Sequence, residues 1–252
     1  MFRADKLQAM ASILWGEDVA AVYDVTSVAM YAPDVLGPAV DRLAELVGAG
    51  PALEFAIGTG RVALPLTQRG VEVHGIELSP HMVDQLRKKP GGDTMPVTIG
   101  DMTSSTASGR FTLVYLVWNS ITNVTTQRDQ TAIFRNAAAH LVPGGRFVVE
   151  VIVPQLRRVP AGETARVFIN EPDHVGVETF DDLVGQIAWS HHWMSVEGRL
   201  VHHAAPYRFV WPSELDLMAE IAGFELEHRW ADWNRGTFTS ESDNQVVVYQ
   251  RP

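Results

Sequence analysis

The chain has 252 residues, of which 46% are hydrophobic and 20% are charged, as in an ordinary globular protein. Its 30 acidic and 20 basic residues give a net charge of −10, which disfavours binding to nucleic acids or anionic membranes. Cysteine is absent, which excludes disulfides, thiol nucleophiles and cysteine-bound metal clusters. The sequence has neither a signal peptide nor a long apolar run, so we expect a cytoplasmic protein without a membrane span.

Short apolar runs alternate with amphipathic stretches between residues 51 and 153, which is typical of a parallel sheet covered by helices on both faces. The pattern predicts strands at residues 51–57, 71–76, 96–99, 111–117 and 146–153. It predicts helices at residues 62–68, 80–88 and 128–141, the second of them capped by Ser79 and opened by Pro80.

The rhythm changes after residue 154. From about residue 164 to residue 210 the apolar runs are strand-like, with no helices between them, which indicates an antiparallel insert. Glu197-Gly198 reads as a two-residue hairpin turn. Such a turn would place His192 opposite His203 and the next residue, Trp193, opposite His202.

The last part of the sequence predicts a helix followed by two strands. Pro212 opens the helix, Ser213 and Asp216 form a capping pattern, and Gly223 ends it. The two strands are predicted at residues 224–230 and 244–250. We therefore predict a single α/β domain with a Rossmann-like, seven-stranded, mostly parallel sheet and an antiparallel insert after the fifth strand. Its four parts are an N-terminal lid (1–48), a cofactor-binding core (51–153), a substrate insert (155–210) and a C-terminal helix with two strands (211–252).

A glycine-rich loop follows the first predicted strand. The segment from Gly58 to Ala63 fits the pattern G-x-G-x-x-A and opens a helix, and Glu77 ends the next strand. This combination is typical of nucleotide binding, because the loop allows close backbone approach and the acid can hold a ribose diol. By itself, the loop indicates a nucleotide-containing cofactor without choosing which one.

Three further features narrow the choice of cofactor. Glu54 lies inside the first strand, where a carboxylate suits a cationic amino-acid group better than a pyrophosphate. Asp101 and Met102 follow the third strand, where an acid can accept a hydrogen bond from an adenine amino group. The segment 141–145 (LVPGG) precedes the fifth strand. An NAD(P)-dependent oxidoreductase explains the glycine loop and Glu77 equally well, but it explains none of these three features.

Together these motifs resemble the class I S-adenosylmethionine (SAM)-dependent methyltransferase family, and in particular the small-molecule enzymes that tailor sugars and antibiotics. The resemblance implies that Glu77 holds the ribose hydroxyls and that Asp101 contacts adenine N6. It also implies SAM as cofactor and S-adenosyl-L-homocysteine (SAH) as product. One departure is Ala56, which stands where the family has its first glycine.

The resemblance extends to an N-terminal lid, in which Tyr23 would reach the carboxylate of SAM. The full set of predicted cofactor-binding residues is Tyr23, Glu54, Ala56, Gly58, Gly60, Arg61, Glu77, Leu78, Met82, Asp101, Met102 and Val117.

Two residues are candidates for the chemistry. Glu150 interrupts an apolar strand near the ligand-binding edge, so it could hold an amine or act as a base. An internal ion pair with Arg146 or an arginine of the insert is the alternative. His192 could act as a base for a hydroxyl substrate. The predicted substrate-binding residues are Tyr31, Trp118, Asn119, Glu150, His192 and His203.

The sequence predicts no metal site, because two facing histidines are too few for a typical zinc site. It also lacks the motifs of methyltransferases that act on DNA. We therefore predict a SAM-dependent methyltransferase, active as a monomer or homodimer, that methylates a nitrogen or oxygen atom of a small molecule. An NAD(P)-dependent oxidoreductase and a non-catalytic SAM-binding protein remain as alternatives.

Overall fold

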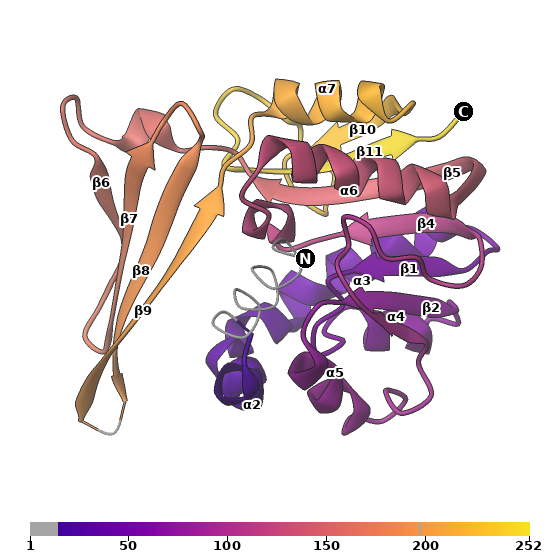
Figure 1. The fold of residues 1–252 in the computed structure, drawn as a ribbon, viewed down its shortest axis with the longest axis horizontal. Coiled ribbons are helices and arrows are strands. Elements are labelled where there is room, and N and C mark those ends of the chain that lie inside the picture. Colours follow the sequence, from indigo (N-terminus) through magenta and orange to yellow (C-terminus); the bar gives the residue numbers. More distant parts are fainter. Residues whose placement is uncertain (1–14, 197) are drawn as a thin grey trace, which may run out of the picture.

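The computed structural model describes residues 15–196 and 198–252 and contains two sheets (Figure 1). The larger sheet has the strand order β10-β11-β5-β4-β1-β2-β3, and only β11 runs antiparallel to its neighbours. This confirms the predicted Rossmann-like fold with a mostly parallel sheet. Its strands are β1 (Ala52–Phe55), β2 (Val73–Glu77), β3 (Val97–Ile99), β4 (Phe111–Leu116), β5 (Leu141–Ile152), β10 (Glu225–Trp230) and β11 (Asn244–Gln250).

Helices cover both faces of this sheet (Figure 1). No helix in the described part of the chain is long and apolar enough to cross a membrane. The helical elements are α2 (Glu17–Thr26), η1 (Val28–Tyr31), α3 (Pro33–Val47), α4 (Ala63–Gln68), α5 (Pro80–Arg87), η2 (Ser120–Asn123), α6 (Gln127–His140), η3 (Leu156–Arg158) and α7 (Pro212–Ile221).

The hydrophobic core lies on both sides of the central strands β1 and β4. Leu53, Phe55 and Val114 belong to the cluster that α6 and α7 cover, while Leu113 and Tyr115 belong to the cluster beneath α3 and α4. All five side chains are fully buried. Burial on both faces explains why these strands are continuous apolar runs rather than alternating ones.

Strand β5 begins earlier than predicted. The ladder with β4 starts at Leu141, which pairs with Phe111, and it resumes at Arg146 after an irregularity. Gly144 adopts a φ of +78°, and its N–H donates to the carbonyl of Arg251 at 2.7 Å. The Pro-Gly-Gly segment therefore forms a kink within β5 and not a loop between α6 and β5. The carbonyl of Arg251 accepts the hydrogen bond from Gly144 and so keeps this segment in the sheet.

The predicted cap of α7 is also wrong. Trp211 is the N-cap residue, Pro212 occupies the first turn, and no side chain caps the helix. Ser213 thus lies within the helix, and Asp216 instead accepts a hydrogen bond from the Tyr249 hydroxyl at 2.9 Å. At the N-terminus of α5, by contrast, Ser79 accepts a hydrogen bond from the N–H of Met82 at 3.3 Å, as predicted. A sequence pattern for a cap does not show which residue leaves the helical conformation first.

The insert forms a separate four-stranded antiparallel sheet in the order β6-β7-β8-β9. Val196 pairs with Arg199, and His192 pairs with His203, so the predicted hairpin register is confirmed. Glu197, the first predicted turn residue, lies outside the described residues. The strands are β6 (Ala165–Glu171), β7 (His174–Asp182), β8 (Ile187–Val196) and β9 (Arg199–Arg208).

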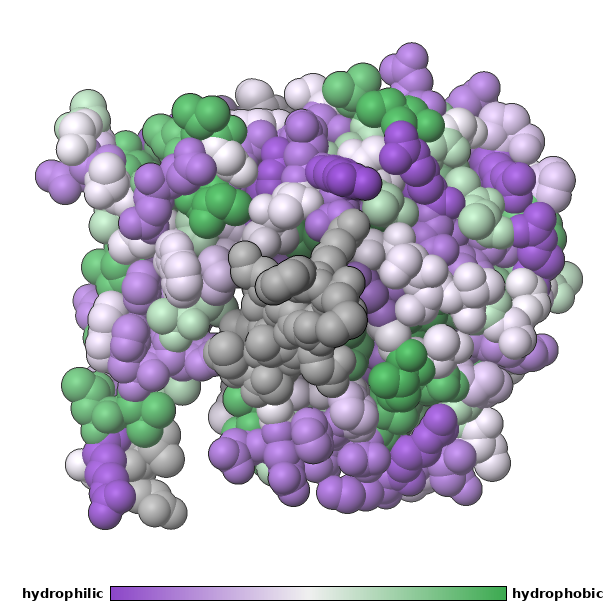
Figure 2. Space-filling view, viewed as in Figure 1, coloured by the Kyte–Doolittle hydropathy of each residue, from purple (hydrophilic) through white to green (hydrophobic). Residues whose placement is uncertain are grey.

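A buried polar network joins the insert to the core. Arg208, only 4% exposed, donates to Glu214 of α7 at 2.6 Å and to Gln130 of α6 at 2.5 Å. Gln186, which precedes β8, accepts a further hydrogen bond from Arg208 at 2.9 Å. The other end of the insert stands away from the core (Figure 2). This network therefore lies where the insert is attached.

Candidate functional site

The glycine loop between β1 and α4 has the backbone conformation that its sequence predicts. Gly58 and Gly60 have φ angles of +57° and +80°. A Cβ atom on Gly60 would lie 2.4 Å from Leu86 Cδ1, and the φ of Gly60 is one that L side chains rarely adopt, so both favour glycine there. Ala56 also adopts a left-handed φ of +53°, which costs an alanine roughly 1–2 kcal/mol. The loop therefore keeps its shape at Ala56 despite the departure from glycine.

Glu77 ties the glycine loop to the start of α5. Its Oε2 accepts a hydrogen bond from the N–H of Gly58 at 2.8 Å, and its Oε1 accepts one from the N–H of Ser79 at 2.9 Å. Burial raises the pKa of Glu77, although the neighbouring backbone N–H groups act in the opposite direction. Each carboxylate oxygen can accept a second hydrogen bond, which is the capacity that a ribose diol requires.

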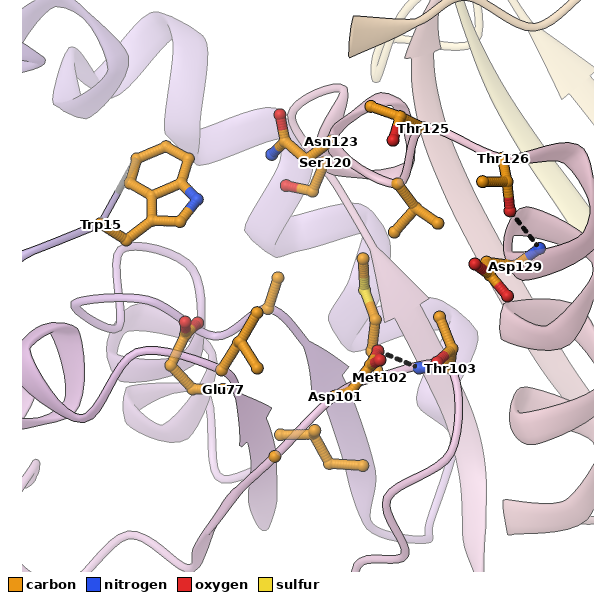
Figure 3. A pocket seen from close by; sticks show the side chains of 15 residues that line it. Trp15, Glu77, Asp101, Met102, Thr103, Ser120, Asn123, Thr125, Thr126 and Asp129 are labelled. Atoms are coloured by element: carbon orange, nitrogen blue, oxygen red, sulfur yellow. Dashed lines mark hydrogen bonds between the residues drawn. The ribbon is translucent and has the colours of Figure 1, made fainter. Parts of the chain in front are cut away.

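A cleft opens at the carboxyl ends of β1, β2 and β3 (Figure 3). Figure 3 shows the Glu77 carboxylate directed into this cleft, with Trp15 across from it and Asn123 on the far side. Five predicted cofactor residues lie together on its wall: Ala56, Glu77, Leu78, Asp101 and Met102.

The cleft combines acidic side chains with apolar wall surface. Asp101 Oδ1 accepts a hydrogen bond from the N–H of Thr103 at 2.8 Å, which fixes the carboxylate at the end of β3. Ile76, Leu78 and Met102 supply apolar surface. This set of acceptors fits a nucleoside, whose ring would pack against apolar side chains while its hydroxyl and amino groups donate to the acids.

Sequence reasoning missed one side of this cleft. Trp15 and the segment that contains η2 and the start of α6 complete the wall, and only the fold brings them there. Ser120 and Asn123 belong to η2, and Thr126 caps α6 by accepting a hydrogen bond from the N–H of Asp129. The position of these residues after β4 could have predicted them, because the connections that follow parallel strands meet at the ligand-binding edge of the sheet.

The other predicted cofactor residues do not line this cleft. Met82 is buried against the glycine loop, and a Cβ on Gly58 would meet its Cε at 3.7 Å. Val117 is buried, and it lines a small cavity with Arg61. The guanidinium of Arg61 stacks over the Trp118 ring at 4.8 Å. Contacts of Met82, Val117 and Arg61 with the cofactor stay predictions.

Glu54 is buried beneath the loop and is only 3% exposed. Its Oε2 accepts a hydrogen bond from the Tyr115 hydroxyl at 2.9 Å. Burial raises its pKa to about 8, even though Tyr115 and Arg61 act to lower it. Burial thus favours the neutral form of Glu54, and its predicted contact with a cationic group stays a prediction.

This raised pKa makes a testable contribution to stability. An unfolded Glu54 ionises near its ordinary value of 4.5, whereas the folded one keeps its proton up to about pH 8. The folded state thus binds more protons in that window, so its stability should fall as the pH rises from about 4.5 to 8, by at most roughly 1.4 kcal/mol per pH unit. Urea unfolding of the wild type and Glu54→Gln across this range measures the difference, and parallel curves would contradict the burial argument.

The N-terminal lid is fastened to the glycine loop. Asp24 Oδ1 of α2 accepts hydrogen bonds from the Tyr31 hydroxyl at 2.5 Å and from Thr59 Oγ1 at 2.6 Å. Lys89 forms an ion pair with the other oxygen of Asp24. The Tyr31 hydroxyl therefore serves the lid contact, and its predicted role in substrate binding stays a prediction.

Tyr23, on the same helix, lies close to the cofactor cleft. Its ring meets Trp15 edge to face at a centroid distance of 5.7 Å. Burial raises its pKa, and Arg61 acts in the opposite direction. The predicted contact of Tyr23 with the cofactor carboxylate stays a prediction. Residues 1–14 of the predicted lid lie outside the described residues.

A second cavity lies between the core and the insert, and Asn123 lines both this cavity and the first cleft. Glu178 of β7 bridges two of its polar side chains, since Arg166 donates to it at 2.6 Å and the Tyr207 hydroxyl at 2.7 Å. The remaining lining residues come from the core edge and from one face of the insert: Asn119, Thr122, Ile152, Pro154, Gln155, Phe168, Phe180, Ser190, Ala205, Pro206 and Phe209.

Glu150 accepts hydrogen bonds from two donors of the chain itself, and its predicted roles as a base and a substrate contact stay predictions. Its Oε2 accepts a hydrogen bond from the N–H of Trp118 at 2.7 Å, and its Oε1 accepts one from the indole of Trp233 at 2.8 Å. It lines a small separate cavity beside Arg61 rather than the cavity under the insert. Arg146 does not pair with it, because Arg146 forms its ion pair with Glu227.

These contacts hold a strained turn in place. Trp118 and Asn119 have φ angles of +54° and +59°, and each such residue costs about 1–3 kcal/mol. The carboxylate of Glu150 holds the N–H of Trp118, and its backbone carbonyl accepts a hydrogen bond from the N–H of Asn119 at 3.1 Å. The side chain of Asn119 accepts a hydrogen bond from the N–H of Ile152 through its Oδ1 and donates one to Thr122 Oγ1 through its Nδ2. Asn119 lies on the wall of the second cavity, and Glu150 acts on it through the backbone.

The two predicted histidines lie farther out on the insert. His192 Nδ1 is 2.7 Å from His174 Nε2, and its Nε2 is 3.0 Å from Ser190 Oγ. Burial lowers the pKa of His192, and so do the facing histidines. His192 and His203 are absent from the walls of both cavities, so their roles as base and substrate contact stay predictions. In the described part of the chain, no group of three or more side chains could hold a metal ion.

Comparisons with known proteins identify the family and agree with the fold. A family model for a methyltransferase domain matches residues 52–145. The CcbJ methyltransferase from Streptomyces caelestis is 35% identical, with a TM-score of 0.76 over 85% of this chain and 88% of that one. The chain belongs to the class I SAM-dependent methyltransferase family. Cypemycin N-terminal methyltransferase from Streptomyces sp is 26% identical over 242 residues, which are 92% of this methyltransferase and 98% of that one.

The same fold occurs with the cofactor in place. SAM-bound CalS10, an amino pentose methyltransferase from Micromonospora echinaspora, has a TM-score of 0.66 at 20% identity and covers 87% of this chain and 91% of that one. Because the chain belongs to the SAM-dependent family, its cofactor is SAM and its product is SAH. These findings remove the NAD(P)-dependent oxidoreductase and the non-catalytic protein as alternatives.

Proposed function

We propose that this methyltransferase methylates an amino nitrogen of a small molecule held in the cavity between the core and the insert. The observation that carries the proposal is the position of Asn123, which lines both this cavity and the cofactor cleft. A substrate in the second cavity would therefore adjoin a cofactor in the first.

Nitrogen is favoured over oxygen by the side chains of the second cavity. A hydroxyl acceptor needs a base, whereas a neutral amine has a free lone pair. Glu178 already accepts hydrogen bonds from Arg166 and Tyr207, and burial raises the pKa of Tyr207. The names of two similar proteins also favour a nitrogen acceptor: the cypemycin N-terminal methyltransferase and the glycopeptide N-methyltransferase MtfA.

The chain itself contributes binding, orientation and the exclusion of water. When bound, SAM supplies an electrophilic methyl group, so the protein mainly has to align the acceptor. Glu77 would hold the ribose hydroxyls, Asp101 the adenine amino group, and Tyr23 with Arg61 the amino-acid end. The insert would cover the acceptor and keep water from it.

The test uses SAM with a deuterated methyl group and a panel of amines, including amino sugars, amino-acid amides and peptides with free N-termini, together with matched alcohols. Mass spectrometry should detect labelled methyl on an amine, and the Glu77→Ala variant should give far less of it. Labelling of alcohols alone would overturn the assignment of nitrogen. Labelling of large peptides with no small amine methylated would overturn the assignment of a small acceptor.

The role of Glu150 gives a further prediction. Glu150→Gln keeps the volume but turns an amide N–H₂ toward either the Trp118 N–H or the Trp233 indole, both of which are donors. SAM affinity should stay unchanged, while kcat for the amine found above should fall by roughly tenfold to a hundredfold, since the turn at Asn119 is misplaced.

Calorimetry with SAM and steady-state kinetics measure the two quantities. Glu227→Gln is the control, because that glutamate pairs with Arg146 away from both cavities. An unchanged kcat in Glu150→Gln would show that the turn does not depend on the charge.

A further inference from the structure

Asn123, the last residue of η2, lies where the two cavities meet. In the described part of the chain it is the only residue that lines both the cofactor cleft and the second cavity. The residue is exposed, and its amide forms no hydrogen bond with any of the described residues. Figure 3 shows this amide extending from η2 toward the side of the cleft on which Trp15 lies. The amide is therefore free to contact a molecule that spans the two cavities.

Several other polar side chains of the second cavity are already bonded within the chain. The Asn119 amide donates to Thr122 Oγ1 at 3.1 Å, and that hydroxyl donates to the carbonyl of Asn119 at 2.8 Å. Glu178 accepts hydrogen bonds from Arg166 and from the Tyr207 hydroxyl. The amide at the end of η2 differs from these groups, because its oxygen can accept a hydrogen bond without giving up a partner.

Methyl transfer to nitrogen creates a charge that an oxygen at this junction can stabilise. The nitrogen lone pair forms the new N–C bond, the electron pair of the C–S bond returns to sulfur, and the positive charge passes to the nitrogen, whose proton is then lost to water. A hydrogen bond from the N–H to Asn123 Oδ1 strengthens as this charge develops, so it stabilises the transition state more than the bound amine. The same bond fixes the orientation of the nitrogen, so that its lone pair can face the cofactor cleft.

A neutral amide suits this role better than a carboxylate. A carboxylate beside the nitrogen would favour the protonated amine, whose lone pair is not available for the reaction. Glu178, the carboxylate on the wall of the second cavity, is already paired with Arg166. The amide oxygen of Asn123 accepts a hydrogen bond without adding a negative charge, so it leaves more of the bound amine in its neutral, reactive form.

We propose that Asn123 contacts the reacting nitrogen and that its Oδ1 accepts a hydrogen bond from the N–H of the acceptor during methyl transfer. This inference rests on the proposed function, since it places the acceptor amine in the second cavity. It adds the class of acceptor, a primary or secondary amine, because a neutral tertiary amine has no N–H to donate.

Binding of sinefungin tests this contact without turnover. Sinefungin is an analogue of SAM that carries an amino group in place of the transferable methyl, and SAH has neither group. Asn123→Leu should weaken the binding of sinefungin roughly tenfold and leave the Kd of SAH unchanged, because only sinefungin offers an N–H to Oδ1. Asn123→Asp should strengthen the binding of sinefungin, because a carboxylate attracts its ammonium group. Isothermal titration calorimetry measures both affinities.

The amine identified by methyl labelling provides a second measurement. Asn123→Leu should lower kcat by roughly tenfold to a hundredfold with little change in KM, since the contact is strongest in the transition state. Asn123→Asp should raise the pKa of the bound amine, so the rise of kcat with pH should move to higher pH. Tertiary amines should stay unlabelled in the wild type and in both variants.

Asn170→Leu is the matched control, because Asn170 is an exposed residue of β6 that lines neither cavity. It should match the wild type in every measurement. A ratio of the sinefungin and SAH affinities that is unchanged in Asn123→Leu would overturn the proposal, as would efficient labelling of a tertiary amine. If no amine is labelled while sinefungin binding still depends on Asn123, the proposed function and the N–H contact both fail, and only the position of Asn123 beside the transferable methyl stands.

Discussion

Replacing Arg208 with methionine should lower the free energy of unfolding by about 3–5 kcal/mol, the usual cost of breaking a buried ion pair by removing one partner. Arg208 is 4% exposed, and Glu214 would remain largely buried after the change. Gln130 and Gln186 would each lose the donor to their amide oxygen. Because these groups join the insert to α6 and α7, the loss should loosen the attachment of the insert as well.

Urea unfolding followed by circular dichroism measures the change, and limited proteolysis tests whether the insert is cleaved first. Arg157→Met is the matched control, since Arg157 pairs with Glu241 at the surface and both side chains are exposed. Exposed pairs contribute about 0–1 kcal/mol, so this variant should stay close to the wild type. Equal effects of the two substitutions would show that burial of the Arg208 network does not determine its contribution.

Glu77→Ala should weaken SAM binding by about 1–3 kcal/mol, or roughly fivefold to 150-fold in Kd, without unfolding the protein. The carboxylate lies on the wall of the cleft and accepts hydrogen bonds from Gly58 and Ser79. Its removal therefore withdraws the proposed ribose contact and frees the N–H that positions the glycine loop. Asp101→Ala should act in the same direction and within the same range, through the loss of the proposed adenine contact.

Calorimetric titration with SAM and with SAH measures these affinities. Glu72→Ala serves as the control, because Glu72 immediately precedes the same strand at the opposite edge of the sheet and is exposed. An unchanged Kd in Glu77→Ala would show that the diol-binding role is wrong. A loss of structure in the same variant would instead show that Glu77 is needed mainly to hold the loop to α5.

Most of the fold was predictable because its signals are local. The strands around residues 52–55 and 111–116 are continuous apolar runs, and the loop at Gly58 and Gly60 needs a backbone that only glycine adopts easily. The hairpin of the insert was predictable for the same reason, since one turn fixes the register of two whole strands. Errors arose at Gly144 and Ser213, where a distant backbone partner or a neighbouring proline set the boundary.

The sequence by itself determined the fold class, because its apolar runs and turns are local signals, and its motifs resembled one cofactor-dependent family. The structure places Glu77 and Asp101 on one cleft wall, and their contacts with SAM stay predictions. Only the tertiary structure decided what Glu150 contacts, since its donors Trp118 and Trp233 lie far from it in sequence. The same holds for Asn123, which lies on the walls of both cavities only because the insert and the core come together there. Side-chain partners of this kind depend on the packing of whole elements, which no local pattern specifies.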